Sequence, residues 1–197
     1  MQSLKLCAAG LFAVIVLAGC ASKTPVDQAK EAIKRGVQFA QQQRYDDAIA
    51  EFSEAIKLDP KSSMAYANRG LMYSREKQYN LAMLDFNTAI GLNPTNSAAY
   101  NNRGNVEDQM EKFNAAKDDY DSAIRANPQE AAGYINRGME WFKVGQMENA
   151  VGDFSVAIQI DPRDPELYRM RANAYEKMLQ PEAAQADRQK AGELSGK

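Results

Sequence analysis

The chain has 197 residues, of which 45% are hydrophobic and 25% are charged, and these values are ordinary for a folded globular domain. Its 24 Lys and Arg side chains nearly balance its 26 Asp and Glu side chains, so the formal net charge is only −2. This composition excludes a broadly disordered chain, and it lacks the basic excess expected of a protein that binds nucleic acid.

The first twenty residues have the features of a bacterial secretion signal. Lys5 precedes an apolar run from Leu6 to Leu17, which is shorter than the roughly 20 residues that span a membrane as a helix. The run ends in Leu17-Ala18-Gly19-Cys20, which resembles the lipobox of bacterial lipoproteins. That resemblance implies removal of residues 1–19 and acylation of Cys20. The alternative is an ordinary cleaved signal that leaves a free thiol.

The residues after Cys20 indicate where such a lipoprotein would reside. Ala21 and Ser22 stand where an Asp would, by analogy with enteric lipoproteins, retain the protein in the inner membrane. We therefore expect an outer-membrane lipoprotein that faces the periplasm and contacts the membrane through its lipid. Residues 20–27 would form a tether that reaches at most about 25 Å before a first helix near Asp27. With Cys7 removed and Cys20 acylated, no disulfide is expected.

The rest of the chain repeats with a period of 34 residues. The repeated types are an Arg followed by Gly or Ala, two Ala columns, an aromatic and a Pro. The Arg positions are Arg35, Arg69, Arg103, Arg137 and Arg171, and the Pro positions are Pro60, Pro94, Pro128 and Pro162. Within one unit, apolar residues recur at helical spacing on both sides of a polar break, and the Pro ends the second segment. Each unit is therefore predicted to be a pair of helices.

This order of aromatic, Gly, aromatic, Ala, aromatic, Ala and Pro over 34 residues resembles the tetratricopeptide repeat. The resemblance implies an all-α, right-handed solenoid of about five helix–turn–helix repeats spanning residues 28–197. The expected units are 29–62, 63–96, 97–130, 131–164 and 165–196. Unit one has Ala32 in place of the usual first aromatic, and unit five has Arg188 in place of the second-helix aromatic. Unit five is therefore expected to be a polar terminal cap.

An acidic residue stands sixteen positions after each repeated Arg. These residues are Glu51, Asp85, Asp119, Asp153 and Asp187. In two antiparallel helices joined by a mid-repeat turn, the Arg and the acid face each other, which predicts a ladder of ion pairs within the repeats. Exposed pairs of this kind contribute only about 0–1 kcal/mol each, so we expect the ladder to affect geometry more than stability. The alternative is a row of Arg side chains that binds an anionic ligand.

Residues that could carry catalysis are scarce. The chain has no His, and it has no Gly-rich phosphate loop between a strand and a helix. The acidic residues Asp118, Asp119 and Asp121 could suggest a Ca²⁺ site, but they fall on a predicted helix, and Asp119 belongs to the ion-pair ladder. We therefore expect no enzymatic activity, no metal site and no cofactor.

The candidate binding residues belong to the first helices of units two to four. Asn68, Asn102 and Asn136 share one register position, which in tetratricopeptide proteins faces the concave groove and commonly bonds the backbone of an extended ligand. An amide both donates and accepts hydrogen bonds, which suits a peptide unit. The alternative is that these Asn side chains only solvate or cap the inner face. The other expected groove residues are Asn101, Asn105, Met139, Phe142, Arg75 and Lys143, with Phe142 alternatively packing against a neighbouring helix.

These features predict a membrane-anchored periplasmic scaffold or adaptor that binds a protein or peptide segment through amides, an apolar pocket and a basic rim. An alternative is an assembly factor similar to the pilotin lipoproteins, which escort an outer-membrane secretin of type IV pili. In that case, a deletion strain would misplace its secretin monomers, and normal secretin multimers would exclude the role. Nucleic acid is not an expected partner.

Overall fold

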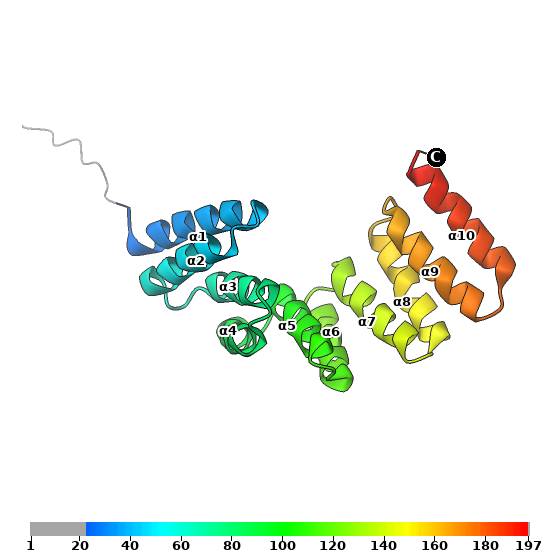
Figure 1. Ribbon diagram of the computed structural model, residues 1–197, viewed down its shortest axis with the longest axis horizontal. Helices are drawn as coiled ribbons and strands as arrows, with labels where there is room; N and C mark the ends of the chain where they lie inside the picture. Colours follow the sequence, from blue (N-terminus) through cyan, green and yellow to red (C-terminus); the bar gives the residue numbers. More distant parts are fainter. Residues whose placement is uncertain (1–22, 197) are drawn as a thin grey trace, which may run out of the picture.

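The computed structural model describes residues 23–196 (Figure 1). This part of the chain forms ten α-helices and no strand, as the period predicts. They are α1 (Pro25–Gln41), α2 (Tyr45–Leu58), α3 (Ser63–Arg75), α4 (Tyr79–Leu92), α5 (Ser97–Gln109), α6 (Phe113–Ala126), α7 (Ala131–Lys143), α8 (Met147–Ile160), α9 (Pro165–Lys177) and α10 (Pro181–Leu194). None of these helices is long and apolar enough to cross a membrane. The cleavage site and Cys20 lie outside the described residues.

Helix α1 begins earlier than the sequence suggested. Thr24 is its N-cap: the Thr24 hydroxyl accepts a bond from the Asp27 amide at 3.2 Å, and the Asp27 carboxylate accepts one from the Thr24 amide at 3.3 Å. Pro25 fills the first helical position, where its missing N–H costs nothing. The helix therefore starts at Pro25 rather than near Asp27, because Asp27 closes this capping box inside the first turn.

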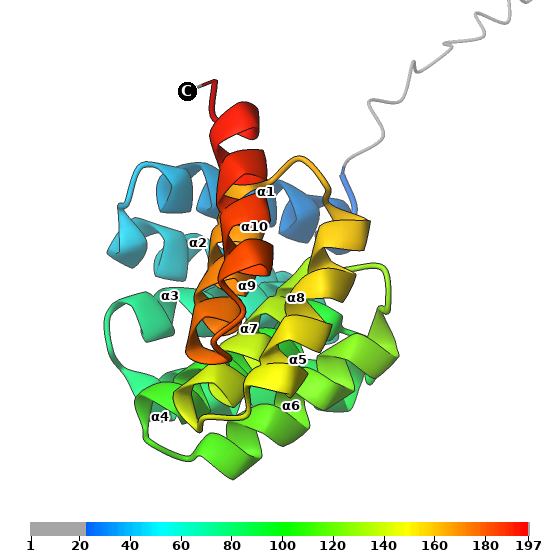
Figure 2. The ribbon, with the colours of Figure 1, turned by 90° about the vertical axis from the view of Figure 1, so that its right-hand side faces the viewer.

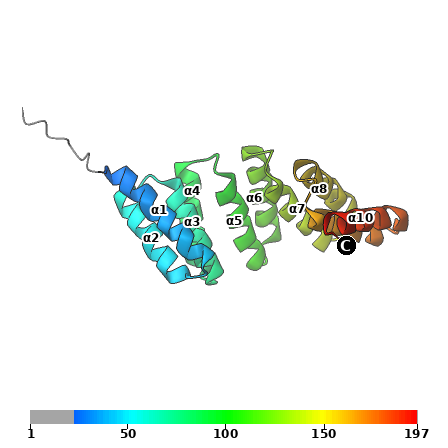
Figure 3. The ribbon, with the colours of Figure 1, turned by 90° about the horizontal axis from the view of Figure 1, so that it is seen from above.

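The helices form five antiparallel pairs that stack in chain order. Each odd-numbered helix packs on the even-numbered helix after it, and each pair contacts the next pair (Figures 1 and 3). The array curves, so that α1 and α10 lie at opposite ends in Figure 1 and the pairs wind around a common axis when viewed from one end (Figure 2). The predicted all-α solenoid is confirmed.

The repeated Gly sets the spacing inside each pair. A Cβ on Gly104 would lie 2.7 Å from the ring of Tyr120, and one on Gly70 would lie 2.9 Å from the ring of Phe86. Gly36 and Gly138 have the same relation to the aromatic ring of their own unit. Unit five departs at both positions together, since Ala172 replaces the Gly where Arg188 replaces the aromatic. The small residue and the ring therefore form one structural unit, as expected from the sequence.

The odd-numbered helices line the inner, concave side of the curve. Helices α1, α3 and α5 each contact the next odd-numbered helix, whereas the even-numbered helices contact mainly their neighbours in the chain. Residues that share a register position on the odd-numbered helices therefore form rows that run along the concave face.

Candidate functional site

All nine predicted groove residues lie on the three central odd-numbered helices. Asn68 and Arg75 are on α3, Asn101, Asn102 and Asn105 are on α5, and Asn136, Met139, Phe142 and Lys143 are on α7. The Asn side chains are half-buried, whereas Arg75, Met139 and Lys143 are exposed. Eight of the nine lie in or between two hollows, which are separated by a stretch whose side chains bond one another. Asn68 instead lines a separate hollow of about 330 Å³ near the start of α3 and α5.

The first hollow lies between α3 and α5, has a volume of about 290 Å³ and is called the α3–α5 hollow below. Its lining mixes polar and apolar surface and carries two cations, Arg75 and Lys77, but no carboxylate. The full lining is Leu71, Ser74, Arg75, Lys77, Tyr79, Asn102, Asn105 and Gln109. It therefore joins predicted groove residues from two units to Lys77, which the sequence gave no reason to select.

The second hollow lies between α7 and α9, has a volume of about 170 Å³ and is called the α7–α9 hollow. Its surface is almost entirely apolar and is formed by Met139, Phe142, Lys143, Phe154, Met170 and Asn173. Phe142 also packs against the core that contains Phe154 and Ala174. The two alternatives predicted for Phe142, lining the groove and packing against a neighbouring helix, therefore both apply. Methionine side chains adapt their shape readily, which suits a pocket for an apolar side chain.

The stretch between the hollows is closed by its own hydrogen bonds. The Asn136 amide donates to the Asn101 carbonyl oxygen at 2.8 Å, and the Tyr120 hydroxyl donates to the Asn105 carbonyl oxygen at 2.9 Å. Asn68 and Asn102, in contrast, make no side-chain hydrogen bond to any described residue. The Asn row is therefore divided: Asn101, Asn105 and Asn136 have structural partners, and Asn68 and Asn102 keep their amides available to a ligand.

Lys143 does not extend a free basic rim. Its ammonium group lies 2.8 Å from both carboxylate oxygens of Asp108 and 2.7 Å from Glu140. Burial opposes the charged form of Lys143, but the hydrogen bonds to Asp108 and Glu140 outweigh it, so the pKa of Lys143 is raised. Because two carboxylates compensate this cation, the free positive charge in the hollows lies at Arg75 and Lys77 instead.

Two acids, the buried Glu140 and the half-buried Glu107, mark the junction between units three and four. Glu140 is 4% exposed and stands in register with Met72, Val106 and Ala174, all of which are buried and apolar. Glu107 stands in register with the aromatics Tyr73 and Trp141. Each acid has one buried carboxylate oxygen without a hydrogen-bond partner among the described residues. The junction is therefore held by polar contacts where the other units use apolar packing.

The environment of these acids favours their neutral forms. Burial, and then the negative charge of Asp119, raise the pKa of Glu107 to about 7, although Arg103 opposes the shift. Burial also raises the pKa of Glu140, against the hydrogen bond from Lys143. The pKa of the Tyr120 hydroxyl is raised by burial and by Asp108 and Glu140. Near neutral pH, this junction therefore contains a carboxyl group that is partly protonated.

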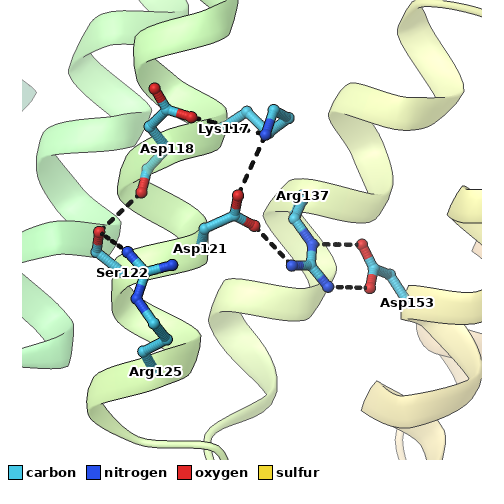
Figure 4. A network of polar contacts seen from close by, with 7 residues as sticks. All are labelled: Lys117, Asp118, Asp121, Ser122, Arg125, Arg137 and Asp153. Atoms are coloured by element: carbon cyan, nitrogen blue, oxygen red, sulfur yellow. Dashed lines mark hydrogen bonds and ion pairs between the residues drawn. The ribbon is translucent and has the colours of Figure 1, made fainter.

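The repeated Arg residues are not available to a ligand. The Arg137 guanidinium donates two bonds to Asp153, at 2.9 and 2.6 Å, and a third to Asp121 of the preceding unit at 2.6 Å (Figure 4). All five predicted Arg–acid pairs are present, which confirms the ladder. From unit two onward, the acid is nearly buried and the Arg half-buried, so the expectation that the pairs are exposed is wrong for those four units.

From unit two onward, each repeated Arg makes a third bond, a contact that sequence reasoning missed. It reaches the residue sixteen positions before the Arg, on the second helix of the preceding unit. The partners are Ser53 for Arg69, Asn87 for Arg103, Asp121 for Arg137 and Ser155 for Arg171. These residues do keep the 34-residue period, but their types differ, so no repeated residue type signals the contact. Each of these four Arg residues therefore joins two consecutive repeats.

The acidic residues that could have suggested a cation site have other partners. Asp119 accepts two bonds from Arg103. Asp121 pairs with Lys117 and Arg137, and the exposed Asp118 lies 3.6 Å from Lys117 (Figure 4). Among residues 23–196, no group of three or more His, Cys, Asp or Glu side chains is placed to hold a metal ion.

Comparison with known families agrees with this architecture. A model described as a TPR repeat matches residues 36–76, and two models described as tetratricopeptide repeats match residues 65–96 and 101–165. Together they cover more than half of the chain. The chain is a tetratricopeptide-repeat protein. The last unit, which has lost the Gly and the aromatic of the tetratricopeptide pattern, lies almost wholly beyond these matches.

Solved tetratricopeptide proteins share the fold at low sequence identity. PilF of Pseudomonas aeruginosa has a TM-score of 0.80 and 17% identity, over 86% of this chain and 78% of that one. YrrB, described as a TPR protein with an unusual peptide-binding site, has a TM-score of 0.63 and 20% identity, over 84% and 86% of the two chains. MamA has a TM-score of 0.69 and 22% identity, over 86% and 93%. No curated protein sequence matches significantly.

Proposed function

We propose that this tetratricopeptide protein is a scaffold whose concave face binds an extended segment of another protein. The observation that carries the proposal is the pair of hollows on the concave face, one cationic and one apolar, together with the amides of Asn68 and Asn102, which bond no described side chain. These groups match the needs of an extended chain, because amides bond its backbone and an apolar pocket accepts a side chain. The peptide-binding site described for YrrB, which has the same fold, supports this choice of ligand.

We further propose that a lipid on Cys20 holds the scaffold at the periplasmic face of the outer membrane. If Cys20 is the anchor, only residues 21–23 separate it from the N-cap Thr24. Four Cα–Cα steps reach at most about 15 Å, which is shorter than the tether estimated from the sequence. The concave face would then capture partners close to the membrane.

Photo-crosslinking in cells tests the binding proposal. A crosslinking amino acid would replace Asn102 or Phe142 in the full chain, and a matched control would replace the exposed Gln159 on α8. We expect the same defined adducts from both groove positions and none from position 159. Equal adducts at all three positions, or none at the groove positions, would refute binding at the concave face.

Metabolic labelling tests the anchor separately. Cells that express the full chain would be grown with radioactive palmitate and then fractionated on a density gradient. We expect label on the chain and its recovery with outer-membrane fractions, and Cys20→Ala should remove the label and release the chain. A labelled Cys20→Ala variant, or an unlabelled parent chain, would contradict the proposal.

A further inference from the structure

The α3–α5 hollow carries positive charge that the chain itself leaves uncompensated. Arg75 and Lys77 both line it and form no ion pair with any residue of the described part. Glu76 lies between them in the sequence but does not line the hollow. The remaining polar groups are neutral hydroxyls and amides, which can donate hydrogen bonds to an anion.

The repeat shows why Arg75 is free when Lys143 is not. The two cations share one register position, and Lys143 is neutralised by Asp108 and Glu140. The residues equivalent to these two acids around Arg75 are Ala40 and Met72. Two carboxylates therefore neutralise the cation of unit four, whereas the equivalent cation of unit two, Arg75, has no carboxylate at these positions.

We propose that the α3–α5 hollow binds an acidic side chain of the extended segment that occupies the concave face. This inference rests on the proposed function and specifies the ligand: an Asp or Glu in the α3–α5 hollow and a large apolar side chain in the α7–α9 hollow. Charge complementarity supports the first position, because two cations and several amide donors surround it without a carboxylate. The apolar lining of about 170 Å³ supports the second.

An internal acidic residue fits better than a chain terminus. The concave face continues beyond the α3–α5 hollow onto α1, where Lys34 shares the register of the Asn row. Lys34 is exposed and forms no ion pair with a described residue. A segment that continued past the hollow would thus meet further positive charge on α1. The part of the segment that contains the acidic residue should therefore lie toward unit one.

The distance between the two hollows follows from the helix packing. The hollows are two odd-numbered helices apart, and packed helices are separated by about 8–10 Å, so the bound acidic and apolar side chains should lie about 20 Å apart. An extended chain advances about 3.3 Å per residue, so the acidic and apolar residues should be about six positions apart.

Selection from a phage-displayed library of random twelve-residue peptides tests this inference. The full chain, purified in mild detergent and immobilised through its C-terminus, would serve as the target. We expect enriched peptides with an acidic and a large apolar residue about six positions apart. A fluorescent synthetic peptide of the enriched sequence would then be titrated by fluorescence anisotropy.

Two matched variants distinguish a specific site from general electrostatics. Arg75→Glu with Lys77→Glu reverses both cations of the hollow, and Lys61→Glu with Arg163→Glu makes the same charge change at exposed loop residues outside it. We expect the first variant to bind the peptide at least tenfold more weakly and the second to bind within twofold of the parent. Equal losses in both variants would overturn the inference.

The remaining outcomes separate this inference from the proposed function. Enriched peptides that lack acidic residues but lose binding after Asn102→Ala or Met139→Ala would refute only the acidic preference. Failure to enrich any peptide, or binding that no concave-face substitution affects, would refute the proposed function as well. Binding that is lost when the peptide C-terminus is amidated would show that a terminal carboxylate is bound, and would overturn the choice of an internal side chain.

Discussion

At the scale of single residues, the repeated Gly leaves no room for a Cβ beside the aromatic ring of its unit. We expect Gly104→Ala to lower the free energy of unfolding by about 1–3 kcal/mol, because the new Cβ would meet the Tyr120 ring at 2.7 Å and the Ala116 carbonyl oxygen at 3.1 Å. Chemical denaturation of the full chain measures this. Gly152→Ala on α8 is the matched control, since nothing lies within 4 Å of a Cβ there. Equal effects of the two substitutions would contradict the packing argument.

Glu107 gives a prediction for pH. Its pKa is about 7 in the folded chain and near 4.5 when unfolded, so between these values the folded state holds a proton that the unfolded state releases. This group therefore lowers stability as pH rises from about 4.5 to 7, and the loss is complete above 7. Glu107→Gln should raise the free energy of unfolding at pH 8 by about 1 kcal/mol and change little at pH 4.5.

Thermal unfolding of the parent and the Glu107→Gln variant at several pH values measures this difference. One kcal/mol corresponds to a rise in Tm of about 2–4 °C for a chain of this size. Glu111→Gln, at the exposed turn after α5, is the control and should leave the pH profile unchanged. A Glu107→Gln profile parallel to the parent profile would show that Glu107 is ionised throughout this range.

At the scale of helix pairs, the Arg–acid ladder should contribute unequally along the chain. The Asp85 side chain is 3% exposed and bonds Arg69 with both oxygens, whereas Arg35 in unit one is 50% exposed. Removing one partner of a buried pair costs about 3–5 kcal/mol, because the other charge remains buried. We expect Asp85→Ala to cost about that much and Glu51→Ala to cost at most about 1 kcal/mol. Similar costs in urea unfolding would contradict this ranking.

The turns inside the helix pairs offer a stabilising change. Gln43, Lys77, Glu111 and Leu179 adopt φ near +60°, and the equivalent residue in unit four is Gly145 at φ +82°. Leu179 is 88% exposed and loses little packing if replaced. Leu179→Gly should therefore stabilise the chain by about 0.5–1 kcal/mol, and Gly145→Ala should destabilise it by a similar amount. Denaturation curves for both variants should shift in opposite directions, and shifts in the same direction would refute this reading of the turns.

Sequence periodicity was sufficient for the helix pairs and for the first bonds of each Arg, because both involve residue types that recur every 34 positions. It was insufficient where a contact depends on a residue type found in one unit alone. Asp108 neutralises Lys143, yet the only other acid at this register position is Glu176, which pairs with Arg188 instead. No acid that recurs with the period therefore indicated that Lys143 would be neutralised. Lys77 was missed for a second reason. It lines the hollow but lies in the turn after α3, outside the helical register positions on which the groove prediction was based.

At the scale of the whole molecule, the array combines rigid joints with an open inner face. From unit two onward, each repeated Arg joins two units. Two hollows on the concave face, between α3 and α5 and between α7 and α9, remain available to a ligand. Solenoids are stabilised mainly by contacts between neighbouring units, so this division leaves the concave face free without weakening the stack. A scaffold that binds through this face needs no large conformational change.

Methionine methyl NMR tests the central claim, binding at the concave face, most directly. The full chain has nine Met residues; Met139 and Met170 line the α7–α9 hollow, and Met178, at the C-terminal end of α9, lines neither hollow. The chain, labelled at its Met methyl groups, would be titrated with the selected peptide. We expect saturable shifts at Met139 and Met170 and no shift at Met178. Shifts at Met178 without any at Met139 and Met170 would contradict binding at the concave face.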